Sequence, residues 1–225
     1  MNFGSKAFAG CLALFLASPV AAATIDVEFW DTDNGSSDPA NNVVDNLNDA
    51  LSIVEGVNQR VADQTFNSSG IDYPTGSVGG GVISSGQYST LSGWLGADAL
   101  SLSGDGSISM LGSVFRFTGQ MMLSAGINAL SVGSDDGYRL RIGGVDVNSV
   151  DATRPFATDY FNYNAAADGL YDFELVYYED NTRHAGVEFK NGGEVVAPVP
   201  IPAGGLLLLT AIGGLGVARR RKTSS

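Results

Sequence analysis

The chain has very few cysteine and histidine residues, and each shortage excludes a kind of site. Its 225 residues include one cysteine, Cys11, and one histidine, His184. Cys11 lies in an apolar N-terminal segment, so the rest of the chain cannot form a disulfide and must be stabilised by a core. A histidine-based catalytic triad would have to be built around His184, and no serine stands in a Gly-x-Ser-x-Gly motif. We therefore expect His184 to be an exposed turn residue.

Basic residues are also scarce. The chain has 12 Lys and Arg against 24 Asp and Glu, a formal net charge of −12. Five of the basic residues lie in the two terminal segments described below, which contain no acids, so the body alone would carry about −17. Such a charge argues against nucleic acid and anionic membrane surfaces as partners. It fits a soluble extracellular protein and one that binds cations, and the simpler alternative is that the acidity only keeps the protein soluble.

The N-terminus has the three parts of a secretory signal peptide. Lys6 provides a positive charge, residues 7–16 are apolar, and small residues up to Ala23 form a cleavage site. The sequence therefore predicts a signal peptide over residues 1–23.

The C-terminal segment, residues 197–225, combines a short motif, an apolar stretch and a basic end. The motif is Val199-Pro200-Ile201-Pro202-Ala203, and residues 219–222 are Arg-Arg-Arg-Lys. Residues 201–218 carry no charge, and a helix of this length would span ~27 Å, enough for a hydrocarbon core. We expect a transmembrane segment there, with the basic cluster on the cytoplasmic side.

This layout resembles the VPLPA-type sorting signals of Gram-negative bacteria, relatives of the PEP-CTERM signals, with Ile201 where the motif usually has Leu. The resemblance implies transient insertion in the inner membrane and processing by an exosortase-type enzyme at residues 199–203. The protein would then reach the cell surface or the extracellular matrix. An ordinary C-terminal membrane anchor is the alternative.

Residues 24–196 are predicted to form one all-β domain. Apolar residues alternate with polar ones in several segments, as they do in half-buried antiparallel strands. The clearest segments are residues 25–29, 114–118, 138–142, 171–177 and 185–189. This pattern favours antiparallel β-sheets with one face against the core. Residues 67–93, rich in Gly and Ser, are predicted to be loops around short strands.

One short helix is predicted near residues 39–55. Apolar residues recur at helical spacing from Val43 to Val54, with Asp38 as a candidate N-cap, Pro39 in the first turn and Gly56 after the end.

The second half of the body resembles the protective-antigen-type (PA-fourteen) domain. The resemblance rests on the run Ser134-Asp135-Asp136-Gly137, followed by Gly169-x-Tyr171-x-Phe173 and Tyr177-Tyr178-Glu179. It implies a β-sandwich or barrel of the kind found in toxins, flocculin-like adhesins and many glycosidases. Phe189 stands where members often have Trp.

The resemblance also implies a calcium site. In the adhesin members a cis peptide joins two adjacent aspartates, which bind Ca²⁺ that in turn holds sugar hydroxyls. Asp135 and Asp136 match that pair, and Asn181 in a later loop matches a third ligand loosely. Ca²⁺ takes 6–8 oxygens, so these residues would supply part of the set. The alternative is that Asp135-Asp136-Gly137 is a turn without a metal.

One further loop and the two tryptophans have weaker functional interpretations. Residues 31–38 form a second acidic loop, which begins like an EF-hand loop but lacks its glycine and glutamate positions, so loop and helix cap is the simpler interpretation. Trp30 and Trp94 are candidates for stacking on sugars, with core packing as the alternative.

Two functions follow from these features. The first is an exported, surface-sorted module that binds extracellular glycans in adhesion. The second is a structural component of the matrix or envelope without a ligand of its own. We do not expect an enzyme, because the acids are scattered over strand faces rather than paired in a cleft.

Overall fold

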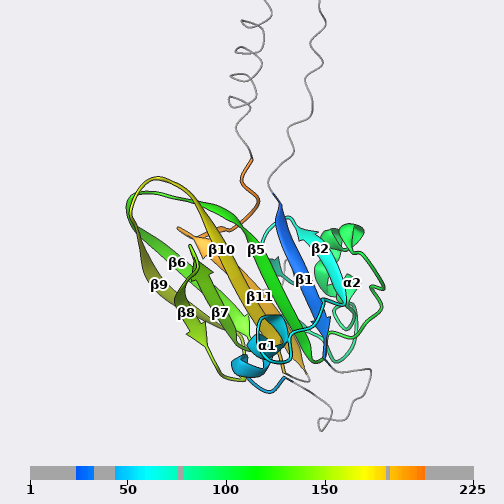
Figure 1. Cartoon of the computed structure of the whole chain (residues 1–225). Coiled ribbons are helices and arrows are strands. Elements are labelled where there is room, and N and C mark those ends of the chain that lie inside the picture. The colour runs from blue at the N-terminus through cyan, green and yellow to red at the C-terminus, as the bar shows by residue number, and fades with distance from the viewer. Residues whose placement is uncertain (1–23, 33–43, 76–78, 181–182, 201–225) are drawn as a thin grey trace, which may run out of the picture. The chain divides into compact units, whose positions relative to one another are not determined.

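The structure, a computed structural model, describes residues 24–32, 44–75, 79–180 and 183–200, which form two β-sheets packed face to face (Figure 1). The first sheet has the order β2-β1-β5-β10-β7-β8. Its strands are β2 (Gln64–Ser68), β1 (Ile25–Asp31), β5 (Ser113–Leu123), β10 (Gly169–Glu179), β7 (Tyr138–Ile142) and β8 (Val145–Val150).

The second sheet has the order β12-β11-β6-β9, and two short strands, β3 and β4, also pair with β11. Its strands are β12 (Glu194–Val195), β11 (His184–Asn191), β6 (Gly126–Asp135), β9 (Ala157–Ala165), β3 (Asp72–Tyr73) and β4 (Gly81–Val82). Every recorded strand pairing is antiparallel. The predicted all-β sandwich is confirmed, and over the described residues the sheets do not close into a barrel.

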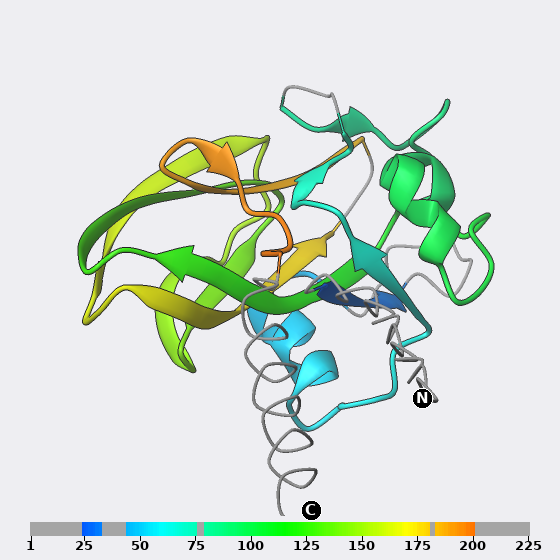
Figure 2. The ribbon, with the colours of Figure 1, turned by 90° about the horizontal axis from the view of Figure 1, so that it is seen from above.

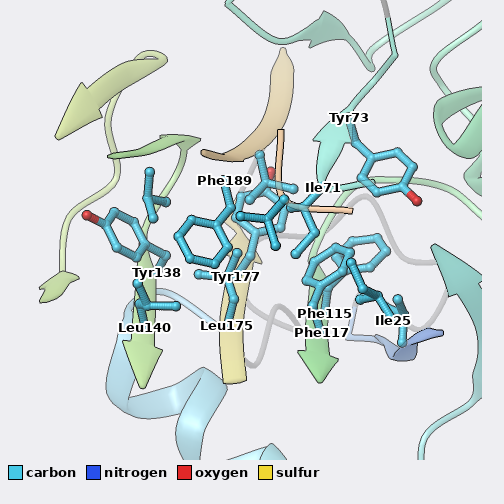
Figure 3. Packing of buried hydrophobic residues seen from close by; sticks show 14 of the residues in the cluster. Ile25, Ile71, Tyr73, Phe115, Phe117, Tyr138, Leu140, Leu175, Tyr177 and Phe189 are labelled. Carbon is cyan, nitrogen blue, oxygen red and sulfur yellow. The ribbon is translucent and has the colours of Figure 1, made fainter. Parts of the chain in front are cut away.

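The core lies between the two sheets and is rich in aromatic side chains (Figure 3). Leu175 of β10 is fully buried and lies opposite Phe117 of β5 and Leu140 of β7 in the strand register. From the other sheet, Phe189 packs edge-on against Phe173, with ring centroids 5.6 Å apart. Alternate residues of β5, β7 and β10 therefore supply the core, as the period-two pattern predicts.

The predicted helix is present but begins later than expected. Helix α1 spans Leu47–Val54, and residues 44–46 are not helical. The side chain of Asn46 is the N-cap: it accepts hydrogen bonds from the backbone N–H groups of Asn48 and Asp49. The predicted start at residue 39 is therefore wrong for residues 44–46, while residues 39–43 lie outside the described part.

Helix α1 covers the outer face of the first sheet (Figure 2). Its Ala50, Ile53 and Val54 belong to a second apolar cluster with Val176 and Tyr178 of β10. Strand β10 is therefore buried on both faces near its C-terminal end, where a half-buried strand was predicted. Burial under a helix explains why Val176 and Tyr178 are apolar there.

A second helical region, α2 (Leu91–Leu95) followed by the 3-10 helix η2 (Gly96–Ser101), was not predicted. The side chain of Thr90 caps α2 by accepting a hydrogen bond from Gly93 N–H. Trp94 is fully buried and stacks on Tyr73, with ring centroids 4.9 Å apart. Trp30 is also buried, and its indole N–H donates to the Arg60 carbonyl. Both tryptophans are core residues rather than sugar-stacking groups.

A buried arginine connects α1 to the first sheet. The side chain of Arg139 on β7 is 5% exposed, and it donates to Glu55 Oε1 at 2.5 Å and to Glu174 Oε1 at 2.6 Å. Glu55 is the C-cap residue of α1. Glu174 faces away from the core as the alternation predicts, yet it neutralises a buried charge instead of facing open solvent.

We therefore expect Glu174→Ala to lower the free energy of unfolding by about 1–3 kcal/mol, because it leaves part of the Arg139 guanidinium without an acceptor. The matched control is Asp172→Ala, an exposed acid on the same face of β10, which should change stability by less than about 0.5 kcal/mol. Urea midpoints of the two variants measure the difference. Equal midpoints would show that the Arg139 contact contributes nothing.

Candidate functional site

Several predicted functional residues lie outside the described part of the structure. Asn181 is one of them, as are the two termini: residues 1–23, which end at Ala23, and residues 201–225, which include Ile201, Pro202, Ala203 and the predicted span 201–218. Val199 and Pro200 are described and have no regular secondary structure. Among the described residues, no helix has the length and apolar character needed to cross a membrane.

The two predicted aspartates meet a third carboxylate at one end of the sandwich. Asp135 is the last residue of β6, and its peptide bond to Asp136 is cis, as the family resemblance implies. Glu179 is the last residue of β10 in the opposite sheet. One carboxylate oxygen from each of the three residues lies within 4.8 Å of the others, and all three side chains are buried.

Backbone N–H groups fix the orientation of the aspartates. Asp136 accepts hydrogen bonds at both oxygens, from Arg154 N–H at 2.8 Å and from Asp180 N–H at 2.9 Å. Asp135 Oδ2 accepts from Phe156 N–H at 3.2 Å. The hydroxyl of Tyr177 donates to the Asp135 carbonyl. The loop after β8 and the end of β10 therefore hold both carboxylates in place.

The site concentrates negative charge in a buried position. Burial, and then the neighbouring charge of Asp136, raise the pKa of Asp135 to about 7. Burial also raises the pKa of Asp136, although the N–H groups of Asp180 and Arg154 oppose this effect. Burial raises the pKa of the Tyr177 hydroxyl well above its usual value, so this group stays a proton donor. A bound cation would favour the charged form of both aspartates.

A cavity of about 260 Å³ gives access to the two aspartates. Asp135 and Asp136 line it together with Thr153, Arg154, Pro155, Arg183 and His184. His184 is exposed, as predicted, and it begins β11 rather than lying in a turn. Hydroxyl, guanidinium and carboxylate groups thus converge on one opening, as in sites for polar ligands.

We expect the calcium-free protein to lose stability as the pH rises from about 4 to about 7. The folded-state pKa of Asp135, about 7, is higher than the value of about 3.9 in unfolded chains. The contribution of Asp135 to stability is therefore fully present below its pKa in the unfolded chain. It is lost as the pH rises through its pKa in the folded protein. Asp135→Asn mimics the neutral carboxyl and should flatten this part of the profile. Denaturant midpoints in EGTA test this, and an unchanged profile in the variant would assign the effect to other groups.

The donor set fits Ca²⁺. Three carboxylates offer only hard oxygen ligands, which Ca²⁺ prefers, and among the described residues their grouping contains neither histidine nor cysteine. Three residues provide fewer ligands than the 6–8 oxygens of a full shell, so a ligand or water would have to complete it.

Glu179 was missed by the sequence reasoning. It lies 44 positions after Asp135 in the chain and reaches the pair only because β10 and β6 end at the same edge of the sandwich. Its position directly after the Tyr177-Tyr178 pair, in the segment that carries the family resemblance, was the available signal. The acidic loop 31–38 is described only at residues 31 and 32, so its interpretation stays a prediction.

Comparison with solved structures agrees with this fold. The PA14 sugar-binding domain from an RTX adhesin superimposes with a TM-score of 0.60 and 26% identity, covering 80% of this chain and 99% of that one. The PA14 domain of the antifreeze protein MpAFP superimposes with a TM-score of 0.59 and 21% identity, covering 83% of this chain and 93% of that one. The body of this chain has the PA14 fold. No protein-family model and no curated protein matches the sequence.

Proposed function

We propose that this PA14 domain is a calcium-dependent carbohydrate-binding module that acts in adhesion, and not an enzyme. The observation that carries the proposal is the group of three buried carboxylates, two of which, Asp135 and Asp136, line a cavity and are oriented by backbone N–H groups. The RTX adhesin domain that superimposes on 80% of this chain is a sugar-binding domain, which supports the same class of ligand.

Asp135 and Asp136 would hold the ion, with Glu179 behind them and Asn181 as a further oxygen ligand. Bound Ca²⁺ would supply coordination positions for sugar hydroxyls. Arg154 lines the same cavity and would help to orient such a ligand. Its position is fixed at both ends, because its backbone N–H donates to Asp136 and its side chain donates to Asp159 at 2.7 Å. Thr153 and Arg183 line the same opening and can hydrogen-bond hydroxyl groups.

A glycan array with and without Ca²⁺ tests this function. We expect binding to a restricted set of glycans that is lost in EGTA and in Asp136→Asn. Asp172→Asn removes one negative charge from an exposed site and should bind like the wild type. The absence of binding to any glycan in Ca²⁺ would favour the second function, a structural component of the extracellular matrix or envelope.

We further propose that the protein is exported across the inner membrane and sorted by an exosortase-type enzyme. Support comes from the residues alone: an apolar N-terminal segment ending at Ala23, the Val199–Ala203 motif, and an uncharged stretch followed by four basic residues. The neighbouring PA14 domains of an adhesin and an antifreeze protein fit a surface or extracellular location.

The processing hypothesis predicts the mass of the native protein. Protein from the cell surface should lack residues 1–23 and should end within residues 199–203, which intact-mass spectrometry measures. Replacing both Pro200 and Pro202 by alanine should leave the C-terminal segment attached, because the motif is lost while the apolar stretch is kept. A dominant wild-type species that retains Arg219-Arg220-Arg221 would instead indicate a permanent membrane anchor.

A further inference from the structure

A second hollow, of about 380 Å³, lies on the outer face of the second sheet, away from the core. Its volume falls within the ~300–1,000 Å³ range of small-molecule sites. Strands β9, β6 and β11 form it, and the loop residues Phe156, Gly79 and Gly193 complete its walls.

The strand register explains why the face is hollow there. Tyr160 of β9, Ser131 of β6 and Lys190 of β11 lie side by side in one row across the sheet. The next row, two residues along, consists of Thr158, Gly133 and Glu188. In both rows the central strand carries the smallest residue and the flanking strands carry larger ones. The result is a groove with β6 as its floor, which extends to Ala129.

Tyr160 gives one wall an exposed aromatic surface. Its side chain is 82% exposed, whereas its neighbours Phe161 and Tyr163 point inward and pack on the core. An aromatic ring at a groove wall offers an apolar face next to a polar hydroxyl. A pyranose ring has the matching shape, because its C–H groups form an apolar face surrounded by hydroxyls.

The opposite wall is polar, and its one lysine is matched by two acids. Lys190 forms an ion pair with Glu188, and the pair raises the pKa of Lys190. Asp72 on β3 lies opposite Glu188, and burial and then the charge of Glu188 raise the pKa of Asp72. The wall therefore offers hydrogen-bond donors and acceptors but no excess positive charge, so it suits a neutral polyhydroxylated ligand better than an anionic one.

Phe156 joins this groove to the aspartate site. Its backbone N–H donates to Asp135 Oδ2, while its side chain lines the groove. The ring lies directly on the backbone of two glycines: a Cβ at Gly133 would stand 2.5 Å from it, and one at Gly186 would stand 3.1 Å from it. Any larger residue at Gly133 would displace the ring. Phe156 thus links the two openings: its side chain lines the groove, and its backbone N–H holds Asp135, which lines the aspartate cavity.

We propose that this groove is a second sugar subsite that binds a neutral pyranose ring against Tyr160, so that the ligand is an oligosaccharide and not a single sugar. The inference takes its ligand class from the proposed function but needs no ion, because its contacts come from side chains of β9, β6 and β11. A protein partner is less well matched: in β6 and β9 the exposed large apolar side chains are Tyr160 and Ile127, a small area for a stable interface.

Titration of the purified full-length protein, followed by NMR, tests the proposal. The probes are cellotetraose, maltotetraose and mannotetraose, with glucose and mannose as single sugars, each in Ca²⁺ and in EGTA. We expect at least one tetrasaccharide to shift the amide signals of residues 158–160 and 188–190 in both conditions. Tyr160→Ala should weaken this binding roughly 3- to 10-fold, and Tyr160→Phe should keep most of it.

The matched control is Ile127→Ala, which removes an exposed apolar side chain of the same sheet face that does not line the groove. It should bind like the wild type. Tetrasaccharide binding that is unchanged in Tyr160→Ala, shifts confined to residues 134–136 and 153–156, or no binding at all would overturn the subsite. If groove shifts persist while neither EGTA nor Asp136→Asn affects any binding, the subsite stands and the calcium-dependent function fails.

Discussion

Leu175→Ala is expected to lower the free energy of unfolding by about 2–5 kcal/mol, the cost of a large cavity in a packed core. Leu175 is fully buried in the middle of β10, the strand that joins the two halves of the first sheet through β5 and β7. Its neighbours in the register, Phe117 and Leu140, are themselves fully buried and held by their own strands. They cannot move far enough to fill the space.

Leu170→Ala is the matched control for this experiment. It makes the same chemical change in the same strand, but Leu170 is 48% exposed. We expect it to cost well under about 1 kcal/mol. Urea or guanidinium midpoints, compared at equal slope, measure both variants. Similar losses at the two positions would contradict the assignment of Leu175 to the core between the sheets.

Local patterns in the sequence predicted half-buried antiparallel strands, because each strand of a two-layer fold must turn one face to the core. The sandwich itself was predicted from the resemblance to the protective-antigen-type domain. The alternation from Tyr171 to Tyr177 gave the register of β10 correctly at Phe173 and Leu175. It could not reveal that α1 covers the other face, because that contact joins residues 47–54 to a strand more than a hundred positions later. The apolar residues Val176 and Tyr178 were the sign in the sequence that this face is also buried.

The helices show where local rules fail. Asp38 and Asn46 are both good N-cap residues, and the pattern from Val43 to Val54 extends across the second one. Asn46 is the cap in the structure, with its side chain hydrogen-bonded to two free N–H groups of α1. Helix α2 has only five residues and contains a glycine, so no period could be recognised. Its Trp94 is held by tertiary packing against Tyr73 rather than by helix propensity.

In the candidate site, too, adjacent residues could be predicted from the sequence, whereas residues brought together by the fold could not. Asp135 and Asp136 are adjacent, so a motif could identify them, and the structure places both side chains at one cavity. Glu179 joins them through the arrangement of β6 and β10, and its position after Tyr177-Tyr178 was the one sign of it in the sequence. The groove beside Tyr160 depends on the register of three strands that are far apart in sequence, and a single exposed tyrosine gives no sign of it.

The second large effect concerns the ion itself. If the three carboxylates bind Ca²⁺, free calcium at ~100 times the dissociation constant should stabilise the protein by ~2.7 kcal/mol. Asp136→Asn should remove most of this increment, because the ligand loses its charge while its shape is kept. Thermal melting with a calcium titration measures the increment in each variant.

The increment, and not the absolute melting temperature, is the quantity to compare. Both oxygens of Asp136 accept backbone N–H groups, so an asparagine there must turn its own amide donor toward another donor. Asp136→Asn should therefore cost about 1–3 kcal/mol even without calcium.

Asp135→Asn is the milder variant, because only Oδ2 of Asp135 accepts a backbone N–H, from Phe156. It should lose the calcium increment with a smaller change in stability without calcium. Asp172→Asn, an exposed acid outside the site, should keep the full increment. Calcium shifts of equal size in all three variants and the wild type would show that Asp135-Asp136-Gly137 is a turn without a metal.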